Sequence, residues 1–317
     1  MGMAKKKIPQ IVKDIRAFKP EPVEWGRQKM ISYSQFNMFT ECPKKWELQY
    51  NSPHKQFTST IHTVFGTAIH EVLQHYLDVM YEKSGAEADR INTYDMFEET
   101  LRNEYALQYK KNKNQHFSSP TELRQFFEEG LEIIRDFAKN RSKYFSKRGW
   151  HLVGCEIPIQ TTPDPTRKSV VYNGYLDIVM YHEPTETFKI IDIKTSRQGW
   201  TKSQKSDEMK QFQLVLYKKF FSELFNVDPK KIEIEFFITK RQMYEHKDYV
   251  IKRIQTFSPP SGKTKQKRVG VALQKFISEA FDSSGKYREI SHEPKENKFC
   301  KWCSFYKTHL CPATFKD

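Results

Sequence analysis

The chain has 317 residues, of which 38% are hydrophobic and 14% aromatic, enough for one large domain or two small ones with a core. Its 53 Lys and Arg against 39 Asp and Glu give a formal net charge of +14, which favours a polyanionic partner, nucleic acid before an anionic membrane. No apolar run reaches the roughly 18 residues of a membrane span, and the first residues lack the apolar core of a signal peptide. We therefore expect a soluble, cytoplasmic protein without a membrane partner.

Helical periodicity and polar breaks divide the chain into segments. Residues 1–30 are basic and contain prolines, so we expect an N-terminal tail there. The strongest helix is predicted to start at Gly66, because apolar residues recur at helical spacing as far as Met80. The predicted helices are, in chain order, 32–42, 66–80, 93–145 in two pieces broken at 110–116, 207–225 and 269–281.

Apolar segments of strand length lie mainly in the second half of the chain. The predicted strands are 151–160, 170–181, 188–195, 232–239 and one near 249–257. Strands that pair first through a hairpin and later through a helix predict an α/β fold with a mixed central β-sheet flanked by helices. We expect one domain over 31–317, with a helical elaboration at 71–148, a catalytic sheet at 149–257, a mobile basic loop at 258–268 and a cysteine-rich C-terminus at 296–317.

An apolar hairpin carries the most informative side chains. Its first arm contains Asp177, a polar turn follows, and its second arm ends in Asp192-Ile193-Lys194. Side chains alternate along a strand, so Asp192 and Lys194 share a face, to which a hairpin can also bring Asp177. Two carboxylates beside an ammonium predict a site for Mg²⁺ or Mn²⁺ with a base or charge stabiliser next to it. The alternative is a surface ion pair, which the apolar neighbours of Asp192 disfavour.

Four motifs in this order resemble those of the RecB-like branch of the PD-(D/E)XK nuclease superfamily. They are similar to its Gly-x-x-x-His-x-x-Leu helix, its Gly-x-x-Asp strand, its Asp-x-Lys-Thr signature and its Gln-x-x-x-Tyr helix. The corresponding stretches are Gly66–Leu73, Gly174–Asp177, Asp192–Thr195 and Gln213–Tyr217. Glu156, on the preceding strand, resembles a less strictly acidic position of the same family.

The resemblance implies a restriction-endonuclease-like core and a metal-dependent DNA exonuclease, acting on single strands or DNA ends in recombination, repair or replication. The metal ligands that it implies are His70, Asp177, Asp192 and the carbonyl of Ile193. Lys194 is then expected to orient the attacking water or to stabilise developing charge. Gln213 and Tyr217 lie four residues apart on one helix face and are expected to contact phosphate and steady Lys194. Because no helicase motif is present, unwinding would need a helicase or recombination partner.

Four of the five cysteines have a spacing that indicates a metal site. Cys300 and Cys303 are separated by two residues, Cys311 follows, and Cys42 lies 258 residues before Cys300. Four thiolates hold either one Zn²⁺ or a [4Fe–4S] cluster, and ligand chemistry leaves both open. The pattern is similar to the iron–sulfur staple of AddB-type helicase–nucleases and CRISPR-associated RecB-like exonucleases, which favours the cluster. Either group would close the chain ends onto the core.

A basic stretch follows the last predicted strand. Lys263, Lys265, Lys267 and Arg268 lie within six residues, after two prolines. Such a loop can clamp a single strand of DNA through its phosphates. The alternative is a solvated loop without a function.

Two other functions compete with the exonuclease. The first alternative is a non-catalytic DNA-end-binding or scaffold subunit of a recombination complex. The presence of Asp177, Asp192 and Lys194 disfavours this alternative. The chain can also be a structure-specific endonuclease or a CRISPR-type processing nuclease. Digestion of circular single-stranded DNA separates this last group from an exonuclease.

Overall fold

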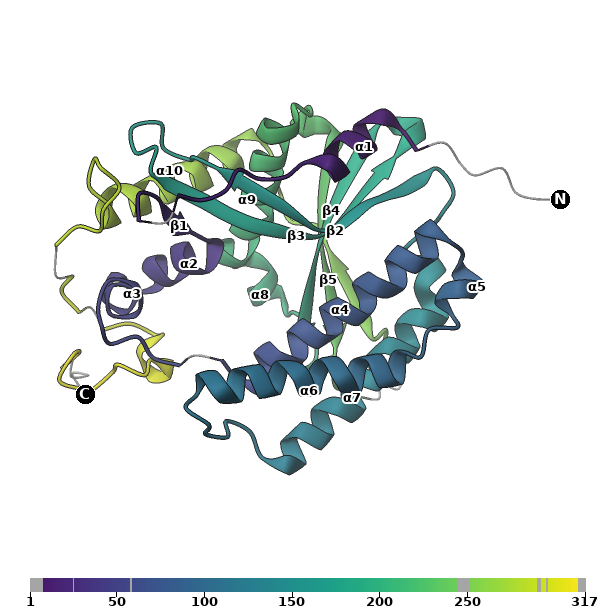
Figure 1. Ribbon diagram of the computed structural model, residues 1–317, viewed down its shortest axis with the longest axis horizontal. Coiled ribbons are helices and arrows are strands. Elements are labelled where there is room, and N and C mark those ends of the chain that lie inside the picture. The colour runs from purple at the N-terminus through teal and green to yellow at the C-terminus, as the bar shows by residue number, and fades with distance from the viewer. Residues whose placement is uncertain are drawn as a thin grey trace. The chain divides into compact units, whose positions relative to one another are not determined.

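The computed structural model describes residues 8–24, 26–57, 59–244, 251–289, 292–294 and 296–312 (Figure 1). Its α-helices are α1 Gln10–Ala17, α2 Tyr33–Glu41, α3 Pro43–Tyr50, α4 Ile61–Glu82, α5 Gly85–Ala88, α6 Thr93–Lys111, α7 Pro120–Asn140, α8 Lys202–Ser206, α9 Glu208–Phe225 and α10 Lys263–Ala280. Its strands are β1 Lys29–Ile31, β2 Trp150–Thr161, β3 Val170–His182, β4 Thr187–Ser196, β5 Ile232–Lys240 and β6 Ile254–Phe257. No helix in these ranges combines the length and apolar character that crossing a bilayer requires.

The described strands form one mixed sheet, which confirms the predicted α/β class. Its order is β1-β3-β4-β5-β6, with β2 also paired to β3. The β3–β4 hairpin is antiparallel, whereas β4 and β5 run parallel because α9 connects them, and β6 is antiparallel to β5. The predicted strands therefore match β2 to β5 closely. Residues 245–250, at the start of the last predicted strand, lie outside the described ranges.

Two segments differ from the sequence-based expectation. The expected tail at 1–30 contains α1, where Val12 and Ile15 are buried and Arg16 donates hydrogen bonds to the carbonyls of Leu152 and Val153. The expected mobile loop at 258–268 is wrong over its second half, because α10 begins at Lys263. Flanking prolines and charge obscured a helix of lysine, glutamine and arginine, which are good helix formers.

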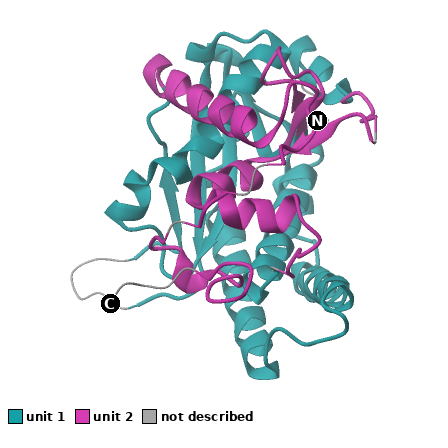
Figure 2. Cartoon of the chain, turned by 90° about the vertical axis from the view of Figure 1, so that its left-hand side faces the viewer, with its two compact units in different colours: residues 1–19, 59–157, 175–261 teal, residues 20–58, 158–174, 262–317 magenta. Residues whose placement is uncertain are grey.

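The chain forms two compact units, each built from segments that are distant in sequence (Figure 2). Unit 1 consists of 1–19, 59–157 and 175–261, and unit 2 of 20–58, 158–174 and 262–317. These limits differ from the expected subdivisions, and the single nuclease domain over 31–317 stays a prediction.

In unit 1, the two faces of β4 are covered by different helices. Ile191 and Ile193 belong to the hydrophobic core that α4, α6 and α7 form on one face. Phe188 lies on the opposite face and contacts Phe221 of α9, with ring centroids 5.2 Å apart. Since side chains alternate along the strand, Asp192 and Lys194 share the face of α9.

Aromatic side chains dominate the core of unit 2. Trp46 of α3 is 1% exposed and contacts Phe39, Phe276, Phe281 and Tyr287 with ring centroids 5.4 to 6.1 Å apart. Such pairs add about 0.5–1.5 kcal/mol each beyond the area they bury. Residues from the first and last parts of the chain therefore share one core.

Gly130 of α7 offers a test of packing in unit 1. A Cβ there would lie 2.2 Å from the Phe97 ring, so Gly130→Ala should destabilise the protein by about 1–3 kcal/mol despite the better helix propensity of Ala. Thermal unfolding measures this change. The control Gly66→Ala, inside α4, places its Cβ 3.7 Å from the Thr195 hydroxyl oxygen, an ordinary contact, and should not lower stability. Equal melting temperatures for both variants would contradict this packing.

Candidate active site

The site lies where β3 and β4 stop pairing. The last antiparallel pair on this side is Ile178 with Ile191, so Asp177 and Asp192 come just beyond it. There the carboxylate of Asp177 replaces the lost strand partner, because its Oδ2 accepts a hydrogen bond from the Ile193 amide at 2.7 Å. The divergence opens space between the strands and places both carboxylates at its edge.

His70 approaches the same peptide from α4. Its Nε2 lies 2.9 Å from the Ile193 carbonyl oxygen, which can only accept, so Nε2 carries the proton. Burial, aided by the charge of Lys194, lowers the pKa of His70 and favours the neutral ring. The free lone pair on Nδ1 then lies 3.5 Å from Asp177 Oδ2. Two acceptors that face each other at this distance suit a shared cation.

Asp192 and Lys194 form a close ion pair. Lys194 Nζ lies 2.8 Å from Asp192 Oδ2, and the Asp192 side chain is 2% exposed. Burial raises the pKa of Asp192 to about 6, although Lys194 opposes this shift. Burial also disfavours the Lys194 ammonium, but Asp192 and Asp177 outweigh it and raise the pKa of Lys194. Within the described residues no hydrogen-bond donor is directed at Asp192 Oδ1, which takes no part in the ion pair and is available to a ligand.

A third carboxylate, that of Glu156, joins the site from β2. Donor atoms of His70, Glu156 and Asp177 all lie within 4.8 Å of one another. Glu156 has a left-handed φ of +52°, an uncommon conformation for a residue with a side chain, and such positions cluster at functional sites. Gln74 of α4 donates hydrogen bonds to Glu156 Oε1 at 2.6 Å and to the Asp177 carbonyl at 2.9 Å. One amide thus fixes both carboxylate-bearing strands.

These donors fit a hard divalent cation. Carboxylate oxygens and one imidazole surround a point where acceptors face each other, and His70 donates its second ring N–H to a backbone carbonyl, as metal-bound histidines do. The Ile193 carbonyl, expected as a ligand, orients His70 through one lone pair and keeps the other. Its role as a ligand stays a prediction.

The predicted helix face on α9 lies close to this cluster. Gln213 donates from Nε2 to the Tyr217 hydroxyl at 3.3 Å, and Tyr217 is 6% exposed. Burial raises the pKa of Tyr217, and the charges of Asp192 and Asp177 add to the shift. Tyr217 is therefore a neutral hydroxyl at neutral pH, next to the acidic cluster.

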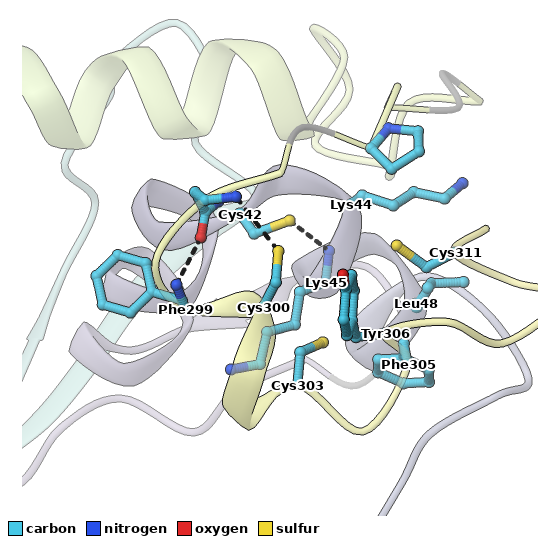
Figure 3. A pocket seen from close by; sticks show the side chains of 12 residues that line it. Cys42, Lys44, Lys45, Leu48, Phe299, Cys300, Cys303, Phe305, Tyr306 and Cys311 are labelled. Atoms are coloured by element: carbon cyan, nitrogen blue, oxygen red, sulfur yellow. Dashed lines mark hydrogen bonds between the residues drawn. The ribbon is translucent and has the colours of Figure 1, made fainter. Parts of the chain in front are cut away.

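The four expected cysteines come together in unit 2. Cys42, Cys300, Cys303 and Cys311 line one cavity (Figure 3), and burial raises the pKa of Cys42, with Cys303 and Cys300 adding to the effect. The Cys42 and Cys300 sulfurs accept backbone hydrogen bonds from Lys45 and Asn297 at 3.4 Å each. No three of the four sulfurs lie within 4.8 Å of one another among the described residues. A tetrahedral Zn²⁺ with bonds of about 2.3 Å would need sulfurs roughly 3.8 Å apart.

The remaining expected site residues lie on α10 of unit 2. Lys263, Lys265, Lys267 and Arg268 occupy the first two turns of this helix rather than a loop. Lys265 and Arg268 have interaction partners in the structure. Contact of these residues with DNA stays a prediction.

Sequence reasoning missed Gln74 and understated Glu156. Gln74 lies four residues after His70 on the helix, so the spacing alone places it on the same face. Glu156 gave a weak signal because its left-handed backbone breaks the alternation of β2.

Two carboxylates and a histidine at one candidate cation position, with the buried Asp192–Lys194 ion pair on the adjoining strand, suit a metal-dependent phosphodiester hydrolase. The model of one family, the PD-(D/E)XK nuclease superfamily, matches residues 30–312, and the chain belongs to this superfamily. Its members typically use divalent ions such as Mg²⁺ or Mn²⁺ and act on DNA.

The chain was also compared with solved structures and with curated proteins. A crystal structure of a candidate exonuclease from Eubacterium rectale is similar, with 11% identity and a TM-score of 0.49 over 99% of this chain and 97% of that one. No curated protein matches the sequence.

The buried charge of Asp177 predicts a pH-dependent stability. Burial raises its pKa to about 6 from the usual 3.8, so the ionised form costs up to about 3 kcal/mol of stability, a cost that is absent below pH 3.8 and complete above pH 6. In EDTA, Asp177→Asn should therefore melt above the wild type at pH 8 and level with it near pH 4. Mg²⁺ should raise the melting temperature of the wild type more than that of the variant.

The matched control is Glu99→Gln on α6, which removes a negative charge that is exposed to solvent. It should leave both pH and metal responses unchanged. A variant at position 177 that is less stable than the wild type at pH 8 in EDTA would contradict the buried-charge account.

Proposed function

We propose that the chain is a RecB-like, metal-dependent DNA exonuclease of the superfamily. The observation that carries this proposal is the convergence of Asp177, Asp192 and Lys194 at the divergence of β3 and β4, with His70 and Glu156 beside them. A chain that had lost catalysis would have no need to keep the Asp192–Lys194 ion pair with a buried carboxylate, because buried charges reduce stability.

The residues divide the work of hydrolysis. His70, Asp177 and Asp192 would hold Mg²⁺ or Mn²⁺, with Glu156 within reach. A bound ion of this kind polarises the phosphate and lowers the pKa of water. Lys194, held by Asp192, orients the attacking water or stabilises charge on the phosphate oxygens. Gln213 and Tyr217 present amide and hydroxyl groups to the phosphate from α9.

Replacement of Asp192 tests catalysis directly. Asp192→Asn should reduce cleavage of end-labelled DNA by at least ~10³-fold, the scale of a single preorganised electrostatic group. Binding of DNA in EDTA should persist or tighten, because a negative charge near phosphate is lost. The measurement is a time course on 5′- and 3′-labelled single and double strands with Mg²⁺.

Glu99→Gln again provides the control and should cleave at the wild-type rate. Wild-type cleavage by Asp192→Asn would refute the site, and absence of cleavage in the wild type with intact binding would favour a scaffold subunit. Digestion of circular single-stranded DNA would indicate an endonuclease or processing nuclease. Association with a helicase or recombination partner, and a cytoplasmic location, remain part of the proposal.

The cysteine cluster supports a second cofactor. We propose that Cys42, Cys300, Cys303 and Cys311 hold a [4Fe–4S] cluster, the finer assignment that the RecB-like resemblance implies. The cavity that all four cysteines line supports a shared metal site, and the choice of a cluster over Zn²⁺ rests on the resemblance. Bound in unit 2, the cluster would join residues from both ends of the chain.

Iron content tests this assignment. Anaerobically purified wild type should be brown and contain about four iron atoms per chain, as a four-cysteine cluster requires. Cys303→Ser should lose the colour and melt at a lower temperature. The control Cys155→Ser, in unit 1, should keep all the iron. Stoichiometric zinc without iron would exclude the cluster and keep the staple.

A further inference from the structure

A group of lysines borders the active site without carboxylate partners. Lys205 lies on α8, Lys210 on α9 and Lys240 at the end of β5. Among the described residues, no carboxylate forms an ion pair with any of the three. The group therefore keeps its positive charge, and unpaired cations close together suit an anionic ligand.

Aromatic rings hold two of these lysines in place. Lys205 Nζ lies 5.7 Å from the centroid of the Phe257 ring, and Lys210 Nζ lies 5.5 Å from that of Trp200. Trp200 packs on Phe236 at 4.8 Å, and Phe236 on Phe257 at 6.3 Å. A ring attracts an ammonium but does not neutralise it, so the N–H donors remain available to phosphate.

The backbone under the lysines is fixed by hydrogen bonds. Gln255 of β6 accepts from the Trp200 amide at 2.8 Å and donates to the Trp200 carbonyl at 3.3 Å. The Ser196 hydroxyl bonds both the amide and the carbonyl of Gly199. Thr201 and Gln204 form a capping box that orients α8 and with it Lys205. Lys205 therefore lies on a hydrogen-bonded segment between β4 and α9.

The position of Lys240 follows from the sheet register. Ser196 pairs with Lys240 and Lys194 with Ile238 in the parallel ladder, so Lys240 shares the face of Lys194. The Lys240 side chain crosses Gly199, where an added Cβ would lie 2.8 Å from its Cε. Lys240 is offset from Lys194 by two residues along the sheet and by one strand across it, so their Cα atoms are roughly 8 Å apart at ~3.3 Å per residue and ~4.8 Å between strands.

We propose that Lys205 and Lys240, with Lys210, bind a backbone phosphate of the substrate strand close to the scissile bond. This inference rests on the proposed nuclease function and names the surface by which the same site receives its strand. Burial lowers the pKa of Lys240, and the nearby charge of Lys205 lowers it further. The two ammonium groups are therefore close enough to bind the same anion. A phosphate between them relieves their repulsion, and the surface reads charge rather than base sequence.

The test measures binding, so it does not depend on catalysis. The salt dependence of binding to a short single strand is measured in EDTA for the wild type and for Lys205→Ala/Lys240→Ala. Because the lysines share one phosphate, the slope of log K against log[salt] should become shallower by about 0.7, the value per neutralised phosphate of a single strand. Lys205→Arg/Lys240→Arg should restore it. The control Lys110→Ala/Lys111→Ala, exposed at the end of α6, removes the same charge and should keep the wild-type slope.

Neutral methylphosphonate linkages locate the contact. A single neutral linkage is moved along the strand from the cleaved bond, and at one position near that bond it should weaken binding to the wild type but not to the double-alanine variant. An unchanged slope in that variant, with an unchanged melting temperature, would overturn the proposal. Loss of inorganic phosphate binding without a change in slope would assign the lysines to free phosphate and would also overturn it. Inactive wild type with the predicted slope change would refute the nuclease function alone.

Discussion

The peptide group of Ile193 is the point on which the active site depends. On a regular antiparallel strand, its amide and carbonyl would pair with β3, but here the amide bonds Asp177 and the carbonyl bonds His70. Unpaired buried backbone groups cost about 1–3 kcal/mol each, so the fold itself demands these two side chains. The same two side chains therefore complete the hydrogen bonds of the Ile193 peptide and form the candidate cation site.

This dual use explains the electrostatic character of the site. Carboxylates drawn in to satisfy backbone or lysine partners are buried, and burial raises the pKa of both Asp177 and Asp192 to about 6. Their charges repel each other until a cation or proton arrives. The positive charge of Lys194 offsets part of this repulsion. Its ion pair with Asp192 holds the ammonium beside the acidic residues.

Much of this arrangement could be predicted from sequence, because period-two alternation and motif order act over short distances. The β3–β4 hairpin, the shared face of Asp192 and Lys194, and the helix of Gln213 and Tyr217 all follow from local pattern. The role of Gln74 could not be predicted, because it depends on a hydrogen bond to Glu156 of β2, which lies far along the chain. The basic start of α10 was mistaken for a loop, because charged residues indicate exposure to solvent but not the backbone conformation. The prolines restrict only the residues before the helix begins.

The interleaved make-up of unit 2 has a consequence for synthesis on the ribosome. Phe39 and Trp46 emerge early, but Phe276, which packs against both, and the three late cysteines emerge only near the end. At ~5–20 residues per second, the 257 residues between Cys42 and Cys300 take on the order of 10–50 s. During that interval the early aromatic residues lack their partners and are open to chaperones or to aggregation. Insertion of the proposed cluster would then be among the last steps of maturation, so newly made chains should be the population most sensitive to iron shortage.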